Sequence, residues 1–292
     1  YEIIEEVAGT GGNTDTLFVY GASSAATSPS YSIWGGTAWG TDTTDGTFAA
    51  AISYTVAYSN PARNEIVTGS ICGDGIAPES IYVNVWNGDT NTWGTALQVT
   101  ANTASTRAFR PFDIAFETFS GDALIFYSSG GNNFAYRVWD GSSWSSESTY
   151  DITIISGNLR WIEAASNPLS NEIAVLVSDD ASDAQGVIWD GSACGNQQLL
   201  TQTLSTATYQ CHDVEYEHTS GYAMFAWGQT ADSLYYIRWL GTSWEAANTL
   251  ITITNQNGVS NWITIHENPA TSSNQLVLTV LDAGSTINTA RW

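Results

Sequence analysis

Three arginines have the residue type and the position to bind a carboxylate. Arg107, Arg110 and Arg160 are among only seven basic residues in the chain. Each lies in a segment that directly precedes a run of β-forming residues, so their guanidinium groups could meet at one face of a strand-rich fold. Guanidinium groups bind carboxylates through paired hydrogen bonds. The sequence thus offers a site for an anionic ligand, and ion pairing with the protein's own acidic groups is the alternative.

The other reactive residue types form no catalytic pattern. The histidines, His212, His218 and His266, share no metal-ligand spacing. Motifs for nucleophilic, zinc-dependent, phosphate-binding or dinucleotide-binding chemistry are absent from the sequence. The 29 acidic residues offer many carboxylate pairs and select none of them. We therefore predict no catalytic residue, no enzymatic activity and no cofactor.

Two acidic loops are candidates for Ca²⁺ binding. They read SDDASD at residues 178–183 and TDTTDG at residues 41–46. Carboxylate oxygens are ligands that Ca²⁺ prefers. Neither loop has the ligand order of an EF-hand, so a solvated acidic surface is the alternative to a metal site.

The charge balance excludes whole classes of partner. Acidic residues number 29 against 7 basic ones, and the net charge is −22. Nucleic acids and anionic lipids are bound by clusters of basic side chains, so neither partner is expected. The sequence has no apolar run of about eighteen residues, so no membrane insertion is expected. The chain starts at Tyr1 rather than Met, which predicts an exported protein whose signal peptide has been removed, outside the cell or at its surface.

A tryptophan at the start of a tight turn recurs along the whole chain. The turns read WGGTAW, WNGDTNTW, WDGSSW, WDGSAC and WLGTSW, and their first tryptophans are Trp34, Trp86, Trp139, Trp189 and Trp239. Trp292 continues the series, and neighbouring members are 50 to 53 residues apart. Six positions at nearly constant spacing indicate a repeat protein.

Each repeat contains short runs of β-branched and aromatic residues separated by Gly, Asn, Asp and Ser. One repeat has such runs at 112–118, 123–129 and 134–141, followed by SSWSSES at 142–148. These runs predict four antiparallel strands, with the tryptophan turn joining the third to the fourth. Four-stranded units of about 50 residues are typical of β-propeller blades. We predict an all-β, six-bladed β-propeller that forms a single domain over residues 1–292, with its last blade incomplete.

The W-x-G-x-x-W hairpin, as in 139–144 and 239–244, resembles that of secreted six-bladed propellers of the fungal and bacterial fucose-type lectins and of sialidases. This resemblance implies the propeller fold and, for a lectin, cell-surface glycans as partners. In a sialidase-type site, Arg107, Arg110 and Arg160 would bind the carboxylate. The Asp-box of sialidases, Ser-x-Asp-x-Gly-x-x-Trp, does not occur in the hairpins of this chain.

Two of the three cysteines replace tryptophans of the repeat. Cys194 aligns with Trp144 and Trp244, and Cys211 aligns with Trp161 and Trp262. Because both members of an aromatic pair change together, we expect the two cysteines to touch and to form a disulfide, as is usual in exported proteins. Cys72 is then left over, as a buried apolar side chain or as an intermolecular link.

The two ends of the chain leave one strand of the propeller unassigned. Residues 1–7, YEIIEEV, could be the first strand of the first blade, or they could serve as the outer strand of the last blade. An unpaired strand edge can accept a strand from a neighbouring subunit, and residues 8–15, AGTGGNTD, would be a suitable hinge. The residues of this assembly edge are Tyr1, Glu2, Ile3, Ile4, Val7, Ile287 and Trp292.

These observations lead to three functional hypotheses. The first is a non-enzymatic extracellular propeller with a structural or adhesive role, which polymerises head to tail by strand complementation at the open blade edge. The second is a carbohydrate-binding lectin with sites between blades. The third is a sialidase-type glycosidase.

Overall fold

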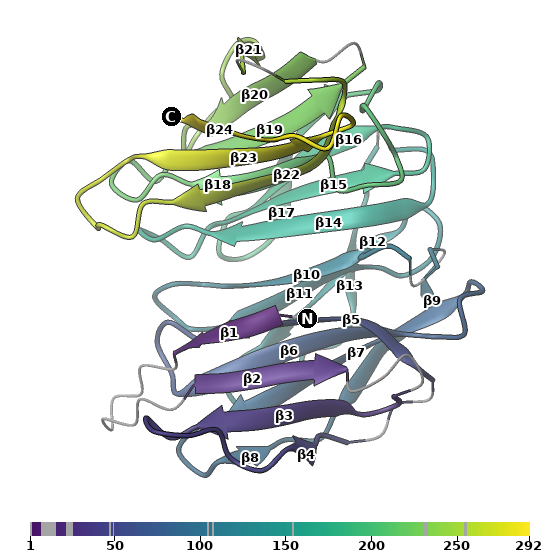
Figure 1. Cartoon of the computed structure of the whole chain (residues 1–292), viewed down its shortest axis with the longest axis vertical. Helices are drawn as coiled ribbons and strands as arrows, with labels where there is room; N and C mark the ends of the chain where they lie inside the picture. Colours follow the sequence, from purple (N-terminus) through teal and green to yellow (C-terminus); the bar gives the residue numbers. More distant parts are fainter. Residues whose placement is uncertain are drawn as a thin grey trace. The chain divides into compact units, whose positions relative to one another are not determined.

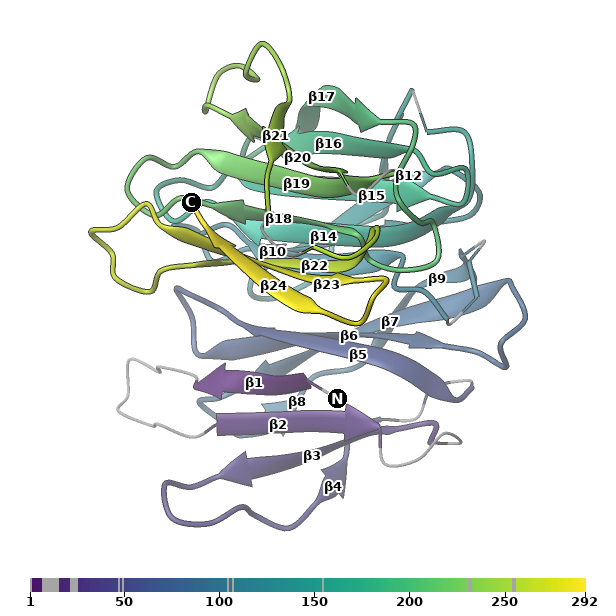
Figure 2. The same ribbon diagram turned by 45° about the horizontal axis from the view of Figure 1, so that its top comes forward.

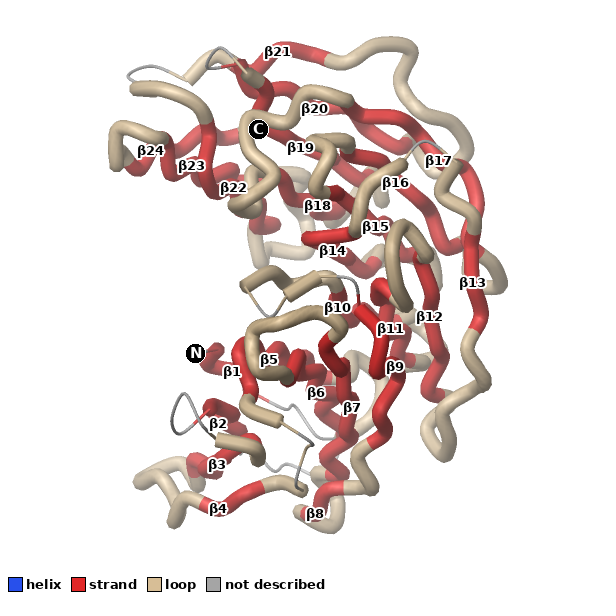
Figure 3. Tube along the Cα trace, turned by 90° about the vertical axis from the view of Figure 1, so that its right-hand side faces the viewer, coloured by secondary structure: helices blue, strands red, loops and turns tan. Residues whose placement is uncertain are grey.

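The computed structural model consists of strands and loops (Figure 1). It describes residues 2–6, 16–21, 26–46, 48, 50–103, 105–106, 108–153, 155–230, 233–253 and 256–292. These residues contain no helix, as the red strands and tan loops of Figure 3 show. Among them there is accordingly no helical segment with the length and apolar character to cross a membrane.

The chain divides into two compact units, residues 1–149 and residues 150–292. The first unit contains three antiparallel sheets. Its first sheet consists of β1 (Glu2–Glu6), β2 (Thr16–Gly21), β3 (Pro29–Trp34) and β4 (Thr43–Thr44). The second consists of β5 (Ile52–Ser59), β6 (Glu65–Cys72), β7 (Glu79–Asn87), β8 (Thr92–Trp93) and β9 (Leu97–Thr103), with β8 and β9 both paired to β7. The third consists of β10 (Phe112–Phe116), β11 (Ala123–Ser128), β12 (Phe134–Trp139) and β13 (Ser148–Tyr150), whose last residue begins the second unit.

The second unit also contains three antiparallel sheets. The fourth sheet of the chain consists of β14 (Leu159–Ser166), β15 (Ile173–Asp179), β16 (Ala184–Trp189) and β17 (Cys194–Thr201). The fifth consists of β18 (His212–Tyr216), β19 (Ala223–Gln229), β20 (Ser233–Trp239) and β21 (Thr249–Ile251). The sixth consists of β22 (Ser260–Glu267), β23 (Leu276–Asp282) and β24 (Ile287–Arg291). The sequence predicts one four-stranded sheet per repeat, and the structure has one sheet per repeat; the second sheet departs from the prediction because β8 and β9 both pair with β7.

The second strands of the second, third and fourth sheets form part of the buried core. Every residue of β6, β11 and β15 is buried. Glycine allows the closest approach between sheets: a Cβ at Gly69 would lie 2.7 Å from Phe112, and one at Gly186 would lie 2.7 Å from Trp244. Within each unit the first strands of successive sheets are neighbours, β5 with β1 and β10, and β18 with β14 and β22.

The repeated tryptophan turn forms as the sequence predicts. Trp139 lies opposite Trp144 across the turn, with ring centroids 5.6 Å apart, and Trp239 lies 5.5 Å from Trp244. Gly141 has a φ of 90°, a conformation that glycine adopts without a Cβ clash. Asp140 accepts hydrogen bonds from the backbone N–H groups of Ser142 and Ser143, at 2.8 Å each, which closes the turn. The pairing of aromatics across the turn is therefore confirmed, although Trp144 and Trp244 form isolated bridges ahead of the fourth strands rather than lying on them.

The sixth sheet has three strands, and β1 belongs to the first sheet. Residues Glu2 and Ile3 of β1 pair with Val19 and Phe18 of β2. Of the two closures considered for residues 1–7, the structure therefore has the first, in which they begin the first sheet; Tyr1 and Val7 lie outside the described residues. Figure 2 shows β24 at the edge of its sheet, and β24 pairs only with β23 among the described strands. Donation of a strand to another subunit stays a prediction.

The predicted disulfide is absent, because Cys72, Cys194 and Cys211 are all free thiols. Cys194 lies in β17, opposite Trp189, at the outer edge of the fourth sheet. Cys211 precedes β18, at the opposite edge of the next sheet, and its thiol lies 3.1 Å from the carbonyl oxygen of Thr206. A disulfide requires Cα atoms about 4.4–6.8 Å apart, whereas the two edges of a four-stranded sheet are about 14 Å apart.

Trp244 and Trp262, which align with these cysteines, have other ring partners. In the second unit, Trp244 packs on Trp239, with ring centroids 5.5 Å apart, and on Phe225, at 4.8 Å. Trp262 packs on Trp161, at 5.6 Å. The repeat alignment therefore identified equivalent positions correctly and assigned the wrong neighbours to them.

Candidate functional site

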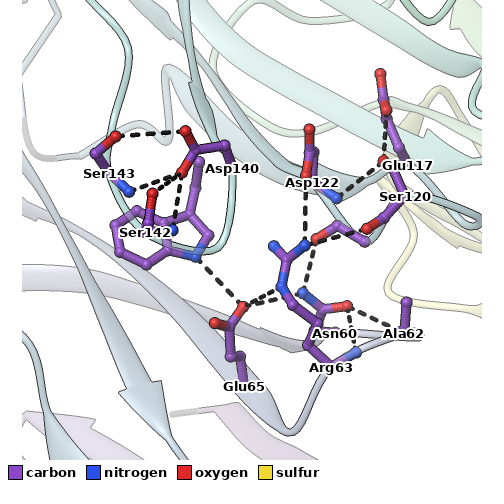
Figure 4. Close-up of polar contacts among 12 residues, drawn as sticks. Asn60, Ala62, Arg63, Glu65, Glu117, Ser120, Asp122, Asp140, Ser142 and Ser143 are labelled. Atoms are coloured by element: carbon purple, nitrogen blue, oxygen red, sulfur yellow. Dashed lines mark hydrogen bonds and ion pairs between the residues drawn. The ribbon is translucent and has the colours of Figure 1, made fainter.

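A cluster of charged and polar groups lies where the second sheet meets the third (Figure 4). Arg63 stands in the loop between β5 and β6, and its Nε donates to Glu65 Oε2 at 2.9 Å. Its Nη1 reaches the third sheet, where it donates to the carbonyl oxygen of Ser120 at 3.1 Å and to Asp122 at 3.3 Å. The arginine therefore links two sheets through two carboxylates and one carbonyl oxygen. We call this group of residues the Arg63 cluster.

The local sequence SNPARNE, residues 59–65, sets the position of Arg63. Asn60 Oδ1 accepts hydrogen bonds from the backbone N–H groups of Ala62, at 2.9 Å, and Arg63, at 3.0 Å. This side-chain turn is typical of asparagine. Asn60 Nδ2 donates to the carbonyl oxygen of Gly121 in the third sheet at 2.7 Å. One asparagine therefore both shapes the loop and fastens it to the next sheet.

The repeated tryptophan completes the Arg63 cluster. The indole Nε1 of Trp139 donates to Glu65 Oε2 at 3.3 Å, so that Glu65 receives hydrogen bonds from both sheets. The turn that follows packs directly on the arginine, because a Cβ at Gly141 would lie 3.1 Å from the guanidinium carbon of Arg63. Hydrogen bonds from Ser142 and Ser143 lower the pKa of Asp140 in this turn to about 2.

A second cluster of the same chemical kind lies where the fifth sheet meets the sixth. Arg238, at the end of β20, donates from Nη2 to Glu245 at 2.6 Å and from Nη1 to Glu217 at 3.4 Å. Glu217 also accepts a hydrogen bond from the indole Nε1 of Trp292 at 3.0 Å. The guanidinium carbon of Arg238 lies 5.3 Å from the ring centroid of Trp292 and 5.9 Å from that of Tyr222. We call this group the Trp292 cluster.

The Trp292 cluster presents an aromatic ring to solvent. Trp292 is 42% exposed, whereas the equivalent Trp86 and Trp239 are 4% and 2% exposed. The ring also packs against Tyr236, with centroids 4.6 Å apart. The hydrogen bond and the negative charge of Glu245 raise the pKa of Arg238 above its ordinary value, so the guanidinium is fully charged. An exposed indole beside a fixed cation and carboxylates can pack on an apolar ring face and bind hydroxyl groups.

A third boundary, between the fourth and fifth sheets, repeats the loop of the Arg63 cluster without its arginine. Asn167 Nδ2 donates to the carbonyl oxygen of Gly221 at 3.3 Å, as Asn60 does to that of Gly121. Glu172 takes the place of Glu65, and its Oε1 accepts a hydrogen bond from the hydroxyl of Tyr216 at 2.9 Å. Ser170 stands where Arg63 stands in the earlier repeat.

The arginines proposed from the sequence as a carboxylate site are placed as follows. Arg107 lies outside the described residues. Arg110 is buried and forms an ion pair with Asp113 at 2.8 Å. Arg160, in the second unit, donates to the carbonyl oxygen of Ala207 at 2.9 Å. Arg110 thus pairs with the protein's own acidic group, and convergence of the three arginines on a ligand stays a prediction.

The acidic loops considered for Ca²⁺ use their carboxylates within the chain. Asp179 accepts hydrogen bonds from the backbone N–H groups of Ala181 and Asp183, at 2.9 Å each, and from that of Gly157 at 2.7 Å. In the other loop, Asp45 is buried and accepts from Asn84 Nδ2 at 2.7 and 2.9 Å. No group of three or more His, Cys, Asp or Glu side chains among the described residues is arranged to hold a metal ion.

Two of the three histidines have a side-chain partner. The Nε2 atom of His212 lies 2.7 Å from the Ser178 hydroxyl, and the Nδ1 atom of His218 lies 3.0 Å from Glu267. His266 is exposed on β22. Of the predicted assembly edge, Ile287 is exposed at the start of β24, and Trp292 belongs to the Trp292 cluster.

Comparison with known proteins shows the fold and leaves the family open. No protein-family model matches the sequence, and no curated protein matches it. Among solved structures, the lectin BP39L from Burkholderia pseudomallei superposes with a TM-score of 0.68 at 14% identity, over 96% of this chain and 78% of that one. The fucose-specific lectin from Aleuria aurantia gives 0.51 at 12% identity, over 97% and 88%. A variant of the sialidase NanB from Streptococcus pneumoniae gives 0.51 at 9% identity, over 100% and 70%.

These similarities confirm the predicted fold class. The chain is a six-bladed β-propeller of antiparallel blades with a three-stranded last blade, similar to propeller lectins and to a sialidase.

The glutamates of the site, Glu65, Glu172, Glu217 and Glu245, were not identified as site residues from the sequence. The paired segments SNPARNE (59–65) and SNPLSNE (166–172) would have indicated two of them, because a repeated charged residue at the entry to a buried strand needs a partner.

Proposed function

We propose that this chain is a non-enzymatic, carbohydrate-binding lectin that acts on cell-surface glycans outside the cell. The observation that carries the proposal is the Trp292 cluster. Sugar-binding sites combine an aromatic surface, which packs on the C–H face of a pyranose ring, with a few fixed polar groups that bind hydroxyls. Trp292 supplies an exposed ring, and Arg238, Glu217 and Glu245 supply a donor and acceptors beside it.

The fold similarity supports this proposal over the others. Two of the similar structures are lectins, one of them described as fucose-specific, and both are covered over most of their length. The sialidase is a weaker match, at 9% identity. In the described residues the arginines of the two clusters are paired with carboxylates, so they are less suited to bind the acidic group of a sialic acid.

The test compares two exposed tryptophans. W292A removes the ring of the Trp292 cluster, whereas W39A removes a ring that is equally exposed, at 48%, but lies against Phe18 and Trp34. On a glycan array, the wild-type protein and W39A should bind the same glycans, and W292A should bind them at least tenfold more weakly. Absence of glycan binding by the folded wild-type protein would refute the proposal. If W292A binds glycans as tightly as the wild-type protein, the sugar site does not include the Trp292 cluster.

The sixth sheet favours self-association as a second candidate. The outer edge of β24, Ile287–Arg291, has no strand partner among the described residues, and such an edge can accept an extended segment of another copy. Electron microscopy of the purified protein tests this directly, because strand complementation predicts filaments and a monomer predicts single particles. Single particles at high protein concentration would contradict the polymer.

A further inference from the structure

The Arg63 cluster shows how a guanidinium fits between two sheets of this protein. The group lies over the tryptophan turn, since a Cβ at Gly141 would lie 3.1 Å from its central carbon. Its donors reach Glu65, Asp122 and the carbonyl oxygen of Ser120. The boundary therefore holds one cation, and that cation comes from the chain itself.

The equivalent boundary of the second unit repeats part of this arrangement without the arginine. Asn167 and Glu172 repeat Asn60 and Glu65, whereas Ser170 replaces Arg63 and Tyr222 replaces Asp122. Gly241 takes the place of Gly141 in the turn, and a Cβ at Gly241 would meet no atom within 4 Å. No side chain therefore covers Gly241 as Arg63 covers Gly141.

The carboxylate of Glu172 remains beside Gly241 with one oxygen that can accept a hydrogen bond. Glu172 Oε1 accepts from Tyr216 and Asn167, and the structure describes no hydrogen bond to its second oxygen, Oε2. Glu172 is half-buried, whereas Glu65, which Arg63 covers, is buried. The indole Nε1 of Trp239, the equivalent of Trp139, is buried without a hydrogen-bond partner among the described residues; as a donor it cannot bind a cation, and it serves below as a probe of the site. A partly desolvated carboxylate beside open space attracts a cation more strongly than one in bulk water.

We propose that the space over Gly241, beside Glu172, binds a guanidinium or primary ammonium group that a small ligand supplies. We call it the Glu172 site. The ligand's N–H groups donate to Glu172 Oε2 in a charge-assisted hydrogen bond, as Arg63 Nε does to Glu65. The net charge of −22 raises the local concentration of cations and favours such a ligand further. This site does not depend on the proposed lectin function.

The experiment uses pairs of ligands of which one member is charged and the other neutral. N-butylguanidinium and N-butylurea have nearly the same shape, and glucosamine and N-acetylglucosamine share the sugar ring but differ by an acetyl group. Titration is followed by nuclear magnetic resonance on the indole N–H signal of Trp239, assigned with W239F. The charged member of a pair should shift this signal with saturation, and the neutral member should leave it unchanged. A response to butylguanidinium alone identifies a guanidinium ligand, and a response to glucosamine extends the site to amino sugars.

Variants separate the site from general attraction to an acidic protein. E172Q removes the acceptor charge and should weaken binding of butylguanidinium at least tenfold. S170R supplies the missing guanidinium and should abolish binding, whereas L169R adds the same charge at an exposed neighbouring residue and should change affinity less than threefold. R63S should open the equivalent space in the first unit and raise the stoichiometry from about one to about two. Circular dichroism and thermal melting verify the fold of each variant.

The proposal has clear failures. It is wrong if E172Q binds as tightly as the wild type, if L169R and S170R reduce binding equally, or if the charged and neutral ligands shift the Trp239 signal alike. Glycan binding on the array with no response to butylguanidinium would leave the lectin standing without the Glu172 site. Binding of butylguanidinium without glycan binding would support the Glu172 site and refute the lectin function.

Discussion

Replacement of Arg63 by alanine tests whether the charged clusters hold neighbouring sheets together. The variant loses the hydrogen bonds from Arg63 to Glu65 at 2.9 Å, to Asp122 at 3.3 Å and to the carbonyl oxygen of Ser120 at 3.1 Å. It also leaves Glu65, whose side chain is only 10% exposed, without a cation. The free energy of unfolding should fall because a stranded, nearly buried carboxylate is costly.

The size of the loss lies between two limits. Breaking a fully buried ion pair costs about 3–5 kcal/mol, and an exposed pair contributes about 0–1 kcal/mol. The Arg63 side chain is 27% exposed, so solvent screens part of the interaction and about 2 kcal/mol is expected. For a chain of this size, that loss corresponds to a decrease of about 4 °C in the melting temperature.

Chemical denaturation monitored by tryptophan fluorescence measures this loss, and R291A serves as the matched control. Arg291 is an exposed arginine on β24, and its removal should change stability by less than about 0.5 kcal/mol. The double variant R63A/E65Q should recover at least half of the loss, since a neutral amide no longer needs a cation. Equal stability of R63A and R291A, or no recovery in the double variant, would refute the assignment of Arg63 as the link between the sheets.

Three further predictions follow from the packing and the titrating groups. G186A should lower the free energy of unfolding by about 1–3 kcal/mol in a denaturant titration, because the added Cβ would lie 2.7 Å from Trp244, while G195A, where a Cβ meets nothing within 4 Å, should have a much smaller effect. Burial raises the pKa of Asp45 to about 6, so the folded state binds more protons than the unfolded state between about pH 4 and 6. Because of this group, the free energy of unfolding falls as the pH rises from about 4 to 6, and D45N should reduce that fall in thermal melts recorded across the same pH range. Burial raises the pKa of the Cys72 and Cys194 thiols to about 12, so iodoacetamide at pH 8 should alkylate the folded protein slowly and the unfolded protein fast, and mass spectrometry without reductant should find three free thiols.

The repeat could be predicted from the sequence because its signal is local. A turn of the form W-x-G-x-x-W needs glycine at positive φ and places its two aromatics opposite each other, whatever surrounds it. The strands on either side follow from their β-forming residues. The order and antiparallel pairing of most of the described strands are therefore contained in segments of about ten residues.

Contacts between sheets were not predictable in the same way. The link from Trp139 to Glu65 joins residues 74 positions apart, and no local pattern states which carboxylate an indole faces. The same limit explains the wrong disulfide: Cys194 and Cys211 are close in sequence, but one belongs to the outer edge of a sheet and the other to the start of the next. A repeat alignment gives equivalence of position, and only the packing of one sheet on another gives neighbours.

The loops between the first and second strands of each sheet alternate between two kinds, so their pattern repeats every two sheets. The first position of the loop is asparagine in the second and fourth sheets, Asn60 and Asn167, and glutamate in the third and fifth, Glu117 and Glu217. Each asparagine donates to a glycine carbonyl of the following glutamate loop, at 2.7 and 3.3 Å. Each glutamate accepts from the serine three residues later, at 2.6 Å in both loops.

This alternation links the sheets in pairs and repeats the asparagine-to-glycine hydrogen bond at each paired boundary. The two boundaries differ in the residues that surround the glutamate: Arg63 and Asp122 at the first correspond to Ser170 and Tyr222 at the second. Where arginine is present, the chain neutralises its own glutamate and the space is filled. Where serine is present, Asn167 and Glu172 are retained and a Cβ at Gly241 would meet no atom within 4 Å, which is why we propose that this boundary takes its cation from a ligand.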